Sequence, residues 1–299
     1  MPGRYPRWIL LLGCFLSFAA SNVRAQIEKL SDAGLPAFLE RVRANTALNA
    51  KQVQQYTSDE FWHNRNFDKK GKTTLDESAK CENVFVEGLP YRKKVEANGK
   101  PLAGKEAEAE EKRYEKAVRE RRAMTTEQKR MSLHTTWHTS LPMCCLATLF
   151  SNHIVGFEKI DGRDTVVIES LPLPDARPRN GDEKSALDWK QKSWIDLGDA
   201  MFARVEAESL SDKNHVAKGM TIRMDFERIA DDQPGKGQPG LSVWLPHAST
   251  QRFGFKMLWV GVTGITEQTW SNYRKFHVDM RLLEETVTPV SAEACKAQE

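Results

Sequence analysis

Three segments in the last third of the chain alternate apolar and polar residues. A period of two is typical of a strand with one buried face and one wet face. The apolar members of these segments are Met220, Ile222, Met224, Phe226, Phe253, Phe255, Met257, Phe276, Val278 and Met280. We predict that these side chains share one apolar face of a sheet. Met and Phe adapt well to flexible chains, so part of this face is a candidate ligand-binding surface.

Further strands are predicted by runs of Thr, aromatic and β-branched residues that end at turn signals. They cover residues 56–66, 72–87, 91–95, 154–160, 165–171, 189–197 and 202–210. Asn98-Gly99 and Asp161-Gly162 are typical of tight hairpins. Together the patterns indicate about nine to eleven strands joined mostly by short connections, which favours a mainly antiparallel sheet.

Helical patterns are few. Leu35, Phe38, Leu39 and Val42 follow the i, i+3, i+4, i+7 spacing of a helix that buries one stripe. Residues 105–122 are mostly charged, with acids early and bases late, which favours a solvated helix. A third, buried helix is expected over 141–150. A large sheet with one apolar face needs a cover, so we predict an α+β fold with helices over that face.

The first residues have the layout of a secretion signal. Arg4 and Arg7 precede an apolar run, and Val23-Arg24-Ala25 supplies a cleavage site before Gln26. A lipid anchor at Cys14 is disfavoured because the apolar stretch continues beyond it. We therefore expect a signal peptide over 1–25, a single domain over 26–285, a mobile tail over 286–299, and a location in the bacterial periplasm.

Cleavage changes the charge balance. The chain has 44 basic and 41 acidic residues, and the signal removes three arginines and no acid. A mature chain without a basic excess has no electrostatic footprint for nucleic acid. No second apolar segment follows the signal, so we expect no transmembrane span in the mature chain. We expect a monomer whose partners are recognised by shape and apolar contact, among them an envelope protein.

The sequence offers little catalytic chemistry. It contains no G-x-S-x-G elbow, phosphate-binding loop or H-E-x-x-H helix, which favours a protein without enzymatic activity or cofactor. The strongest cluster of metal-binding residue types is His134, His138, Cys144, Cys145 and His153. Thr135, Thr136 and Trp137 favour helix poorly, so metal binding is only an alternative. The spacing of Cys81, Cys144, Cys145 and Cys295 forms no recognisable disulfide framework, and a bridge from Cys81 to Cys144 or Cys145 stays open.

The order of several short motifs resembles the Lol-type periplasmic lipoprotein carriers over about residues 54–285. These motifs are Pro90-Tyr91-Arg92-Lys93-Lys94-Val95, Asn98-Gly99-Lys100-Pro101-Leu102, Gly156-Phe157, Asp161-Gly162-Arg163, Lys192-Ser193-Trp194-Ile195-Asp196 and Arg204-Val205-Glu206. The resemblance implies a curved antiparallel half-barrel whose concave apolar face is covered by helices and holds lipid or lipoprotein acyl chains. It brings no catalytic residues with it.

The first functional hypothesis is therefore a periplasmic binding protein or chaperone that buries acyl chains. Its lid would be formed by the helices near 35–48 and 141–150, through Phe38, Leu39, Leu146 and Phe150. The second is an envelope interaction or sensor module with the same fold, a filled interior and a partner on the charged helix. The third is the metal-binding protein described above.

Overall fold

The computed structural model describes most of the predicted domain. The described residues are 30–31, 33–129, 132, 146–179, 181–212, 217–229, 242–257 and 260–275. The expected signal peptide over 1–25 and the expected tail over 286–299 lie outside these residues.

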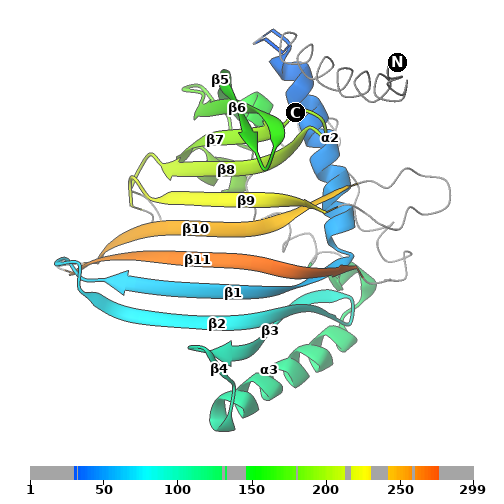
Figure 1. Cartoon of the computed structure of the whole chain (residues 1–299), viewed down its shortest axis with the longest axis vertical. Coiled ribbons are helices and arrows are strands. Elements are labelled where there is room, and N and C mark those ends of the chain that lie inside the picture. Colours follow the sequence, from blue (N-terminus) through cyan, green and yellow to red (C-terminus); the bar gives the residue numbers. More distant parts are fainter. Residues whose placement is uncertain are drawn as a thin grey trace, which may run out of the picture.

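The described chain forms one open sheet of eleven antiparallel strands. The strands are β1 (Tyr56–Phe67), β2 (Thr73–Val86), β3 (Leu89–Ala97), β4 (Lys100–Pro101), β5 (Phe150–Ile160), β6 (Arg163–Pro172), β7 (Trp189–Asp196), β8 (Met201–Ser209), β9 (Thr221–Ile229), β10 (Val243–Met257) and β11 (Val260–Lys275). Their order is β4-β3-β2-β1-β11-β10-β9-β8-β7-β6-β5, with β4 and β5 at the edges. The sheet is a curved half-barrel, as predicted, and Figure 1 shows it with β5 at the top and β4 at the bottom.

Two meanders make up this sheet. One runs through β1 to β4 and the other through β5 to β11, and the pairing of β1 with β11 joins them over residues 56–67 and 263–275. Short turns join β2 to β3, β3 to β4 and β5 to β6, whereas the connection from β6 to β7 contains the short helix α6 (Gly181–Ala186). Glu87, Asn98 and Asp161 adopt a positive φ, each followed by a glycine that does the same, which is the geometry of tight hairpins. The predicted hairpins at Asn98-Gly99 and Asp161-Gly162 are thus confirmed.

Helix α2 (Leu35–Val53) covers the β5–β9 end of the sheet. Its buried residues are Leu35, Phe38, Leu39 and Val42, the stripe that the spacing predicts. Val166, Ile168, Ile195 and Val205 belong to the same core cluster. We call the face of the sheet that carries these four residues the inner face. Val166 and Ile195 are fully buried, so the inner face is closed by packing at β6 and β7.

Hydrogen bonds also fasten α2 to the sheet. The Asn49 amide donates to the Trp244 carbonyl oxygen and accepts from the Trp244 backbone N–H, both at 2.8 Å. One turn earlier, the Asn45 amide donates to the carbonyl oxygen of Asp199 at 2.7 Å. Since each bond satisfies a backbone group at the border of the core, α2 is a fixed part of the fold.

Three differences from the sequence prediction concern element bounds. Within the described residues the expected helix over 141–150 is only α5 (Leu146–Leu149), and Phe150 already begins β5. β10 is one long strand that begins at Val243, well before the alternating segment around Phe253. β11 was not predicted, because its residues do not alternate between apolar and polar.

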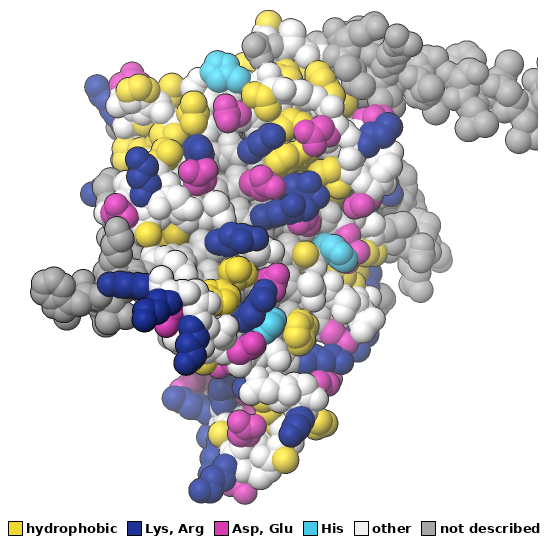
Figure 2. Space-filling view, turned by 60° about the vertical axis from the view of Figure 1, so that its left-hand side comes forward, with side chains coloured by type: hydrophobic (Ala, Val, Ile, Leu, Met, Phe, Trp, Pro, Cys, Tyr) yellow, Lys and Arg dark blue, Asp and Glu magenta, His cyan; other side chains and the backbone are white. Residues whose placement is uncertain are grey.

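The outer face carries opposite charges side by side. Arg204 and Arg223 both bind Asp225, and Trp194 lies between the Arg204 guanidinium and the Lys192 ammonium, at 5.4 and 4.8 Å from its ring. Figure 2 shows Lys and Arg interspersed with Asp and Glu, and hydrophobic side chains gathered towards the top. None of the described helices is long and apolar enough to cross a membrane.

Candidate functional site

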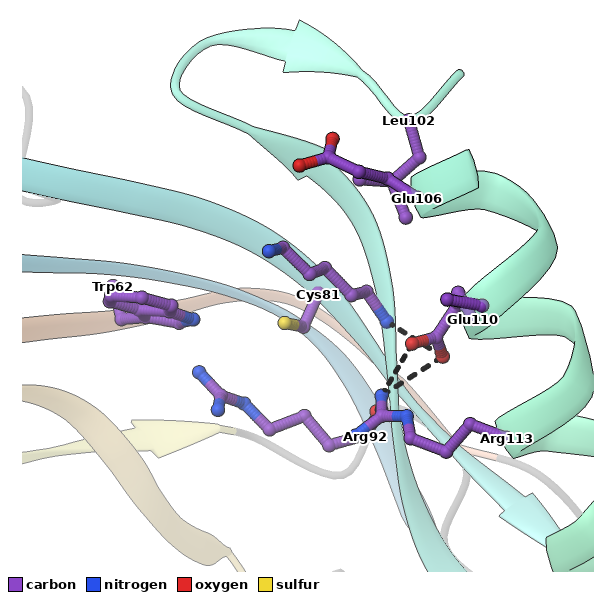
Figure 3. A pocket seen from close by; sticks show the side chains of 9 residues that line it. Trp62, Cys81, Arg92, Leu102, Glu106, Glu110 and Arg113 are labelled. Atoms are coloured by element: carbon purple, nitrogen blue, oxygen red, sulfur yellow. Dashed lines mark hydrogen bonds and ion pairs between the residues drawn. The ribbon is translucent and has the colours of Figure 1, made fainter. Parts of the chain in front are cut away.

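A cavity of about 420 Å³ lies between the β1–β3 end of the inner face and helix α3 (Gly104–Ala123). We call it the α3 cavity. Its lining residues are Trp62, Cys81, Arg92, Lys94, Leu102, Glu106, Ala109, Glu110 and Arg113. In Figure 3 Trp62 lies on one side and Glu110 of α3 on the other, with Cys81 between them. Its volume is within the range of small-molecule sites.

A buried carboxylate organises the sheet side of the α3 cavity. Glu60 is 4% exposed and binds Arg92 through two contacts, Nε at 2.9 Å and Nη2 at 2.7 Å. The amides of Asn83 and Gln268 donate to it at 3.3 and 3.1 Å. Both carboxylate oxygens are therefore occupied, and the Arg92 guanidinium is held 5.8 Å from the centre of the Trp62 ring.

A second buried carboxylate holds α3 in place. Glu110 is the buried residue of this helix, and it accepts hydrogen bonds from the Tyr91 hydroxyl at 3.0 Å and the Lys94 backbone N–H at 3.2 Å. Arg113 pairs with it at 2.8 Å. The hydrogen bond to Glu110 raises the pKa of Arg113, and burial, followed by the bond to Glu110, raises the pKa of Tyr91.

Helix α3 also covers the free edge of β3. β4 pairs only with Glu96 and Ala97, so the rest of that edge needs other partners. Arg121 donates to the carbonyl oxygens of Leu89 and Pro90 at 3.0 and 2.8 Å, and Arg113 donates to that of Arg92 at 2.7 Å. Burial lowers the pKa of Arg121. The charged helix predicted over 105–122 is confirmed, and its basic residues close a sheet edge.

Cys81 forms part of the apolar wall of the α3 cavity. It is 2% exposed and is a free thiol, and its candidate partners Cys144 and Cys145 lie outside the described residues. Burial is the main cause of a raised pKa for this thiol, and the nearby Arg92 only partly opposes it. Cys81 is therefore a neutral apolar group at physiological pH.

The sequence-predicted apolar face coincides with the inner face at β9. Ile222, Met224 and Phe226 are half-buried there, and Met224 pairs with Val205 of the core. Met220 directly precedes β9 and is half-buried. Phe253 of β10 lies across Gly264 of β11, where an added Cβ would come within 2.2 Å of the ring.

The remaining predicted ligand and lid residues have varied positions. Phe255 and Met257 belong to β10, and Leu146 belongs to α5. Phe38 and Leu39 of α2 and Phe150 of β5 are buried in the core cluster. Phe276, Val278 and Met280 lie outside the described residues. Among the described lining residues of the α3 cavity there is no predicted ligand residue, so the role of these residues in binding stays a prediction.

Of the five residues in the metal-binding hypothesis, the structure describes only His153. His134, His138, Cys144 and Cys145 lie outside the described residues, and no group of three potential metal ligands occurs within them. His153 is exposed on β5, where its Nε2 lies 2.8 Å from the Ser151 hydroxyl. A serine hydrogen-bonded to a histidine is a catalytic pattern, but this pair lies at an exposed edge, away from the α3 cavity.

A third ionic cluster lies at the ends of β7 and β10. Asp196 is 1% exposed and binds Arg163 at 2.6 and 2.7 Å, and Asp199 binds Arg228 at 2.7 Å and Trp244 at 3.0 Å. Burial alone would raise the pKa of Asp199, but these partners outweigh it and the pKa is lowered. Since the carboxylates are occupied, the cluster serves to join strand ends beneath α2.

The fold and the site together define an open antiparallel half-barrel with a cavity beneath the helix that covers its β3 edge. Neither a known family nor a curated protein matches the sequence. Solved structures with a similar fold include a putative outer membrane lipoprotein-sorting protein domain from Vibrio parahaemolyticus (13% identity, 84% of this chain and 97% of that one, TM-score 0.34).

Two further similar structures are a DUF1329 family protein from Desulfovibrio piger (12% identity, 82% and 96% covered, TM-score 0.31) and a LolA superfamily protein from Nitrosomonas europaea (10%, 79% and 94%, TM-score 0.27). The Vibrio and Nitrosomonas proteins carry the names of the lipoprotein-sorting group that the sequence resembles. With TM-scores this low, they transfer no residue, ligand or partner to this chain.

Sequence reasoning did not find the α3 cavity. Its residues come from β1, β2, β3 and α3, apart from Leu102, which lies between β4 and α3, and none of these segments has a strong apolar alternation. One signal was present: Trp62 and Glu60 share a face at a spacing of two, and an aromatic beside a carboxylate on an inner face indicates a site more than a core.

Proposed function

We propose that this protein is an exported binding protein that holds the acyl chain of an envelope amphiphile, without catalysing a reaction. The observation that carries the proposal is the α3 cavity, an opening of about 420 Å³ on a face that is closed by packing at β6 and β7. The predicted signal peptide supports a periplasmic location. The lipoprotein-sorting resemblance is consistent with this class of ligand.

The wall of the α3 cavity suits the first part of an alkyl chain. Trp62, Leu102 and Ala109 are apolar, and Cys81 is kept neutral by burial. Each methylene removed from water contributes about 0.8 kcal/mol, so about six methylenes contribute roughly 5 kcal/mol before the costs of binding. That is enough for measurable affinity without a cofactor or a covalent bond.

The strand register extends this wall towards the predicted apolar face. Trp62 pairs with Gln268, Gln268 with Ser249, and Ser249 with Met224. Directly opposed residues of antiparallel strands share a face, so all four lie in one row across the inner face. At a strand spacing of about 4.8 Å, the row from Trp62 to Met224 spans roughly 14 Å. Trp62 and Met224 are the apolar, half-buried members of this row, and Gln268 and the buried Ser249 lie between them.

A cavity-filling variant tests the proposal. Ala109 lines the α3 cavity, so Ala109→Trp should weaken binding of dodecylphosphocholine, measured by calorimetry below its micelle concentration, at least tenfold. Ala123→Trp, at the exposed end of the same helix, is the matched control and should bind like the wild type. Equal affinity of Ala109→Trp and wild type would show that the α3 cavity is not the site.

Extraction of the purified protein gives an independent test. Mass spectrometry after organic extraction should find a co-purified amphiphile in the wild type and much less in Ala109→Trp. If neither protein carries lipid, and the wild type binds no dodecylphosphocholine, the proposed function is wrong.

The interaction-module hypothesis rests on the solvent side of α3. Its exposed charges include two pairs along the helix, Lys116 with Glu120 at 3.7 Å and Arg119 with Glu115 at 3.5 Å. Deleting 105–122 would remove a cavity wall as well as this surface. Reversing Lys116 and Arg119 to Glu is therefore the cleaner test: it should abolish capture of an envelope partner and leave amphiphile binding unchanged.

A further inference from the structure

The charges that line the α3 cavity fall into two groups. Arg92 is paired with Glu60, and Arg113 is paired with Glu110. Each of these pairs is closed by further hydrogen bonds to its carboxylate, so neither has a net charge to offer a ligand.

Lys94 and Glu106 form the second group. Within the described part of the chain neither side chain has an ion-pair partner, and they do not pair with each other, although both line the α3 cavity. They come from opposite walls, Lys94 from β3 and Glu106 from the first turn of α3. Figure 3 shows Glu106 beside Leu102, at the end of the cavity away from Arg113.

A ligand with a single charge can satisfy only one of these two groups. An anionic head that pairs with Lys94 leaves Glu106 facing it, and a cationic head has the reverse problem. A head with both charges meets a partner on each wall, and its formal charge of zero matches that of the lining once the closed pairs are counted.

Resting on the proposed function, we propose that the α3 cavity selects amphiphiles with a zwitterionic head of the phosphate–ammonium type. The phosphate pairs with Lys94, the ammonium pairs with Glu106, and the chain leaves along Trp62. The ligand class is thus a zwitterionic phospholipid or its lysolipid, in preference to a free fatty acid.

Four amphiphiles with the same twelve-carbon chain test this selection by calorimetry below their micelle concentrations. They are dodecylphosphocholine, laurate, dodecyltrimethylammonium and dodecyl maltoside. The zwitterion should bind the wild type at least tenfold more tightly than each of the other three. Equal binding of all four, or tightest binding of laurate, overturns the headgroup proposal and leaves amphiphile binding standing. Binding of none overturns the proposed function itself.

Charge-removing variants identify the two walls. Lys94→Gln should lose at least fivefold in affinity for dodecylphosphocholine and gain relative preference for dodecyltrimethylammonium, whereas Glu106→Gln should shift the preference towards laurate. Lys105→Gln and Glu108→Gln, on exposed positions of α3 that do not line the cavity, are the matched controls. Because the readout is a ratio between ligands, a general loss of stability does not imitate it. Unchanged ratios in both variants contradict the assignment.

Discussion

The two ends of the inner face differ in how a helix covers them. At the β5–β9 end, α2 packs four buried apolar side chains against Val, Ile and Phe residues of the sheet. At the β1–β3 end, α3 buries one residue, Glu110, and is held by ion pairs and by hydrogen bonds to the edge of β3. Apolar packing closes the first end, and polar docking at an edge leaves a cavity at the second.

The difference shows how one sheet combines stability with a binding site. Burial of apolar side chains is non-directional and fills space, so the α2 end has the character of a core. Ion pairs and hydrogen bonds fix a helix at defined points and tolerate space between them. The α2 end therefore stabilises the half-barrel, and the α3 end provides the site.

The largest effect is expected from the packed end. Phe38→Ala removes a buried ring of α2 and should lower the free energy of unfolding by about 3–5 kcal/mol, measured by denaturant titration. Leu48→Ala is the control on the same helix. Leu48 is 56% exposed, so its loss should change stability by less than about 0.5 kcal/mol. Similar losses in both variants would contradict the packing of α2.

A smaller effect is expected from the buried carboxylate of the open end. Glu60→Gln removes the charge that holds Arg92, and should cost about 2 kcal/mol of unfolding free energy. The cost stays below that of a fully buried pair because the Arg92 side chain is 44% exposed and can turn to water. Glu267→Gln breaks the more exposed pair with Arg65, so a change below about 1 kcal/mol serves as control. A cost for Glu60→Gln no larger than that of the control would show that Glu60 does not organise the site.

A still smaller loss of stability is expected when the contacts that hold α3 are weakened. Glu110→Gln keeps an acceptor for the Lys94 N–H but removes the ion pair with Arg113, and should cost about 1 kcal/mol. Hydrogen exchange at the Lys94 amide should become faster, while amides of β7 keep their protection. Uniform acceleration over the whole sheet would mean that α3 and the core open together, which contradicts a separate docking of α3.

The smallest effect at neutral pH concerns Cys81. Burial raises the pKa of this thiol. Both the folded and the unfolded chain therefore keep the thiol protonated at pH 7, and its ionisation makes no contribution to stability there. Above the ordinary value of about 8.5 the unfolded chain loses the proton first, and the folded state loses stability as pH rises towards the raised pKa. The stability advantage of wild type over Cys81→Ala should therefore shrink between pH 8 and pH 10 in urea titrations. A pH-independent difference contradicts the burial of a protonated thiol.

The sequence was sufficient for the part of the fold that depends on local patterns. The stripe from Leu35 to Val42 predicted α2, and alternation predicted β9 because Ile222, Met224 and Phe226 face a largely apolar neighbourhood. β11 was not predicted from the sequence because its inner-face residues, Thr266 and Gln268 among them, lie at the polar end of the sheet. A strand without an apolar face has no period of two to detect.

The site depends on contacts far apart in the sequence. Glu60 meets Gln268 across the junction of the two meanders, and Glu110 meets Tyr91 only after α3 folds back on β3. A helix with thirteen charged residues among eighteen is predicted to be solvated, and its local sequence does not distinguish Glu110 as a buried residue. The ligand-binding surface was accordingly predicted on β9 and β10, where the apolar pattern is strongest.

The most direct test of the binding site is a crystal structure with 12-bromododecylphosphocholine. We expect density for the head between Lys94 and Glu106 in the α3 cavity, and anomalous bromine density beside Trp62. Ligand density beneath α2, or only on the outer face, would contradict it.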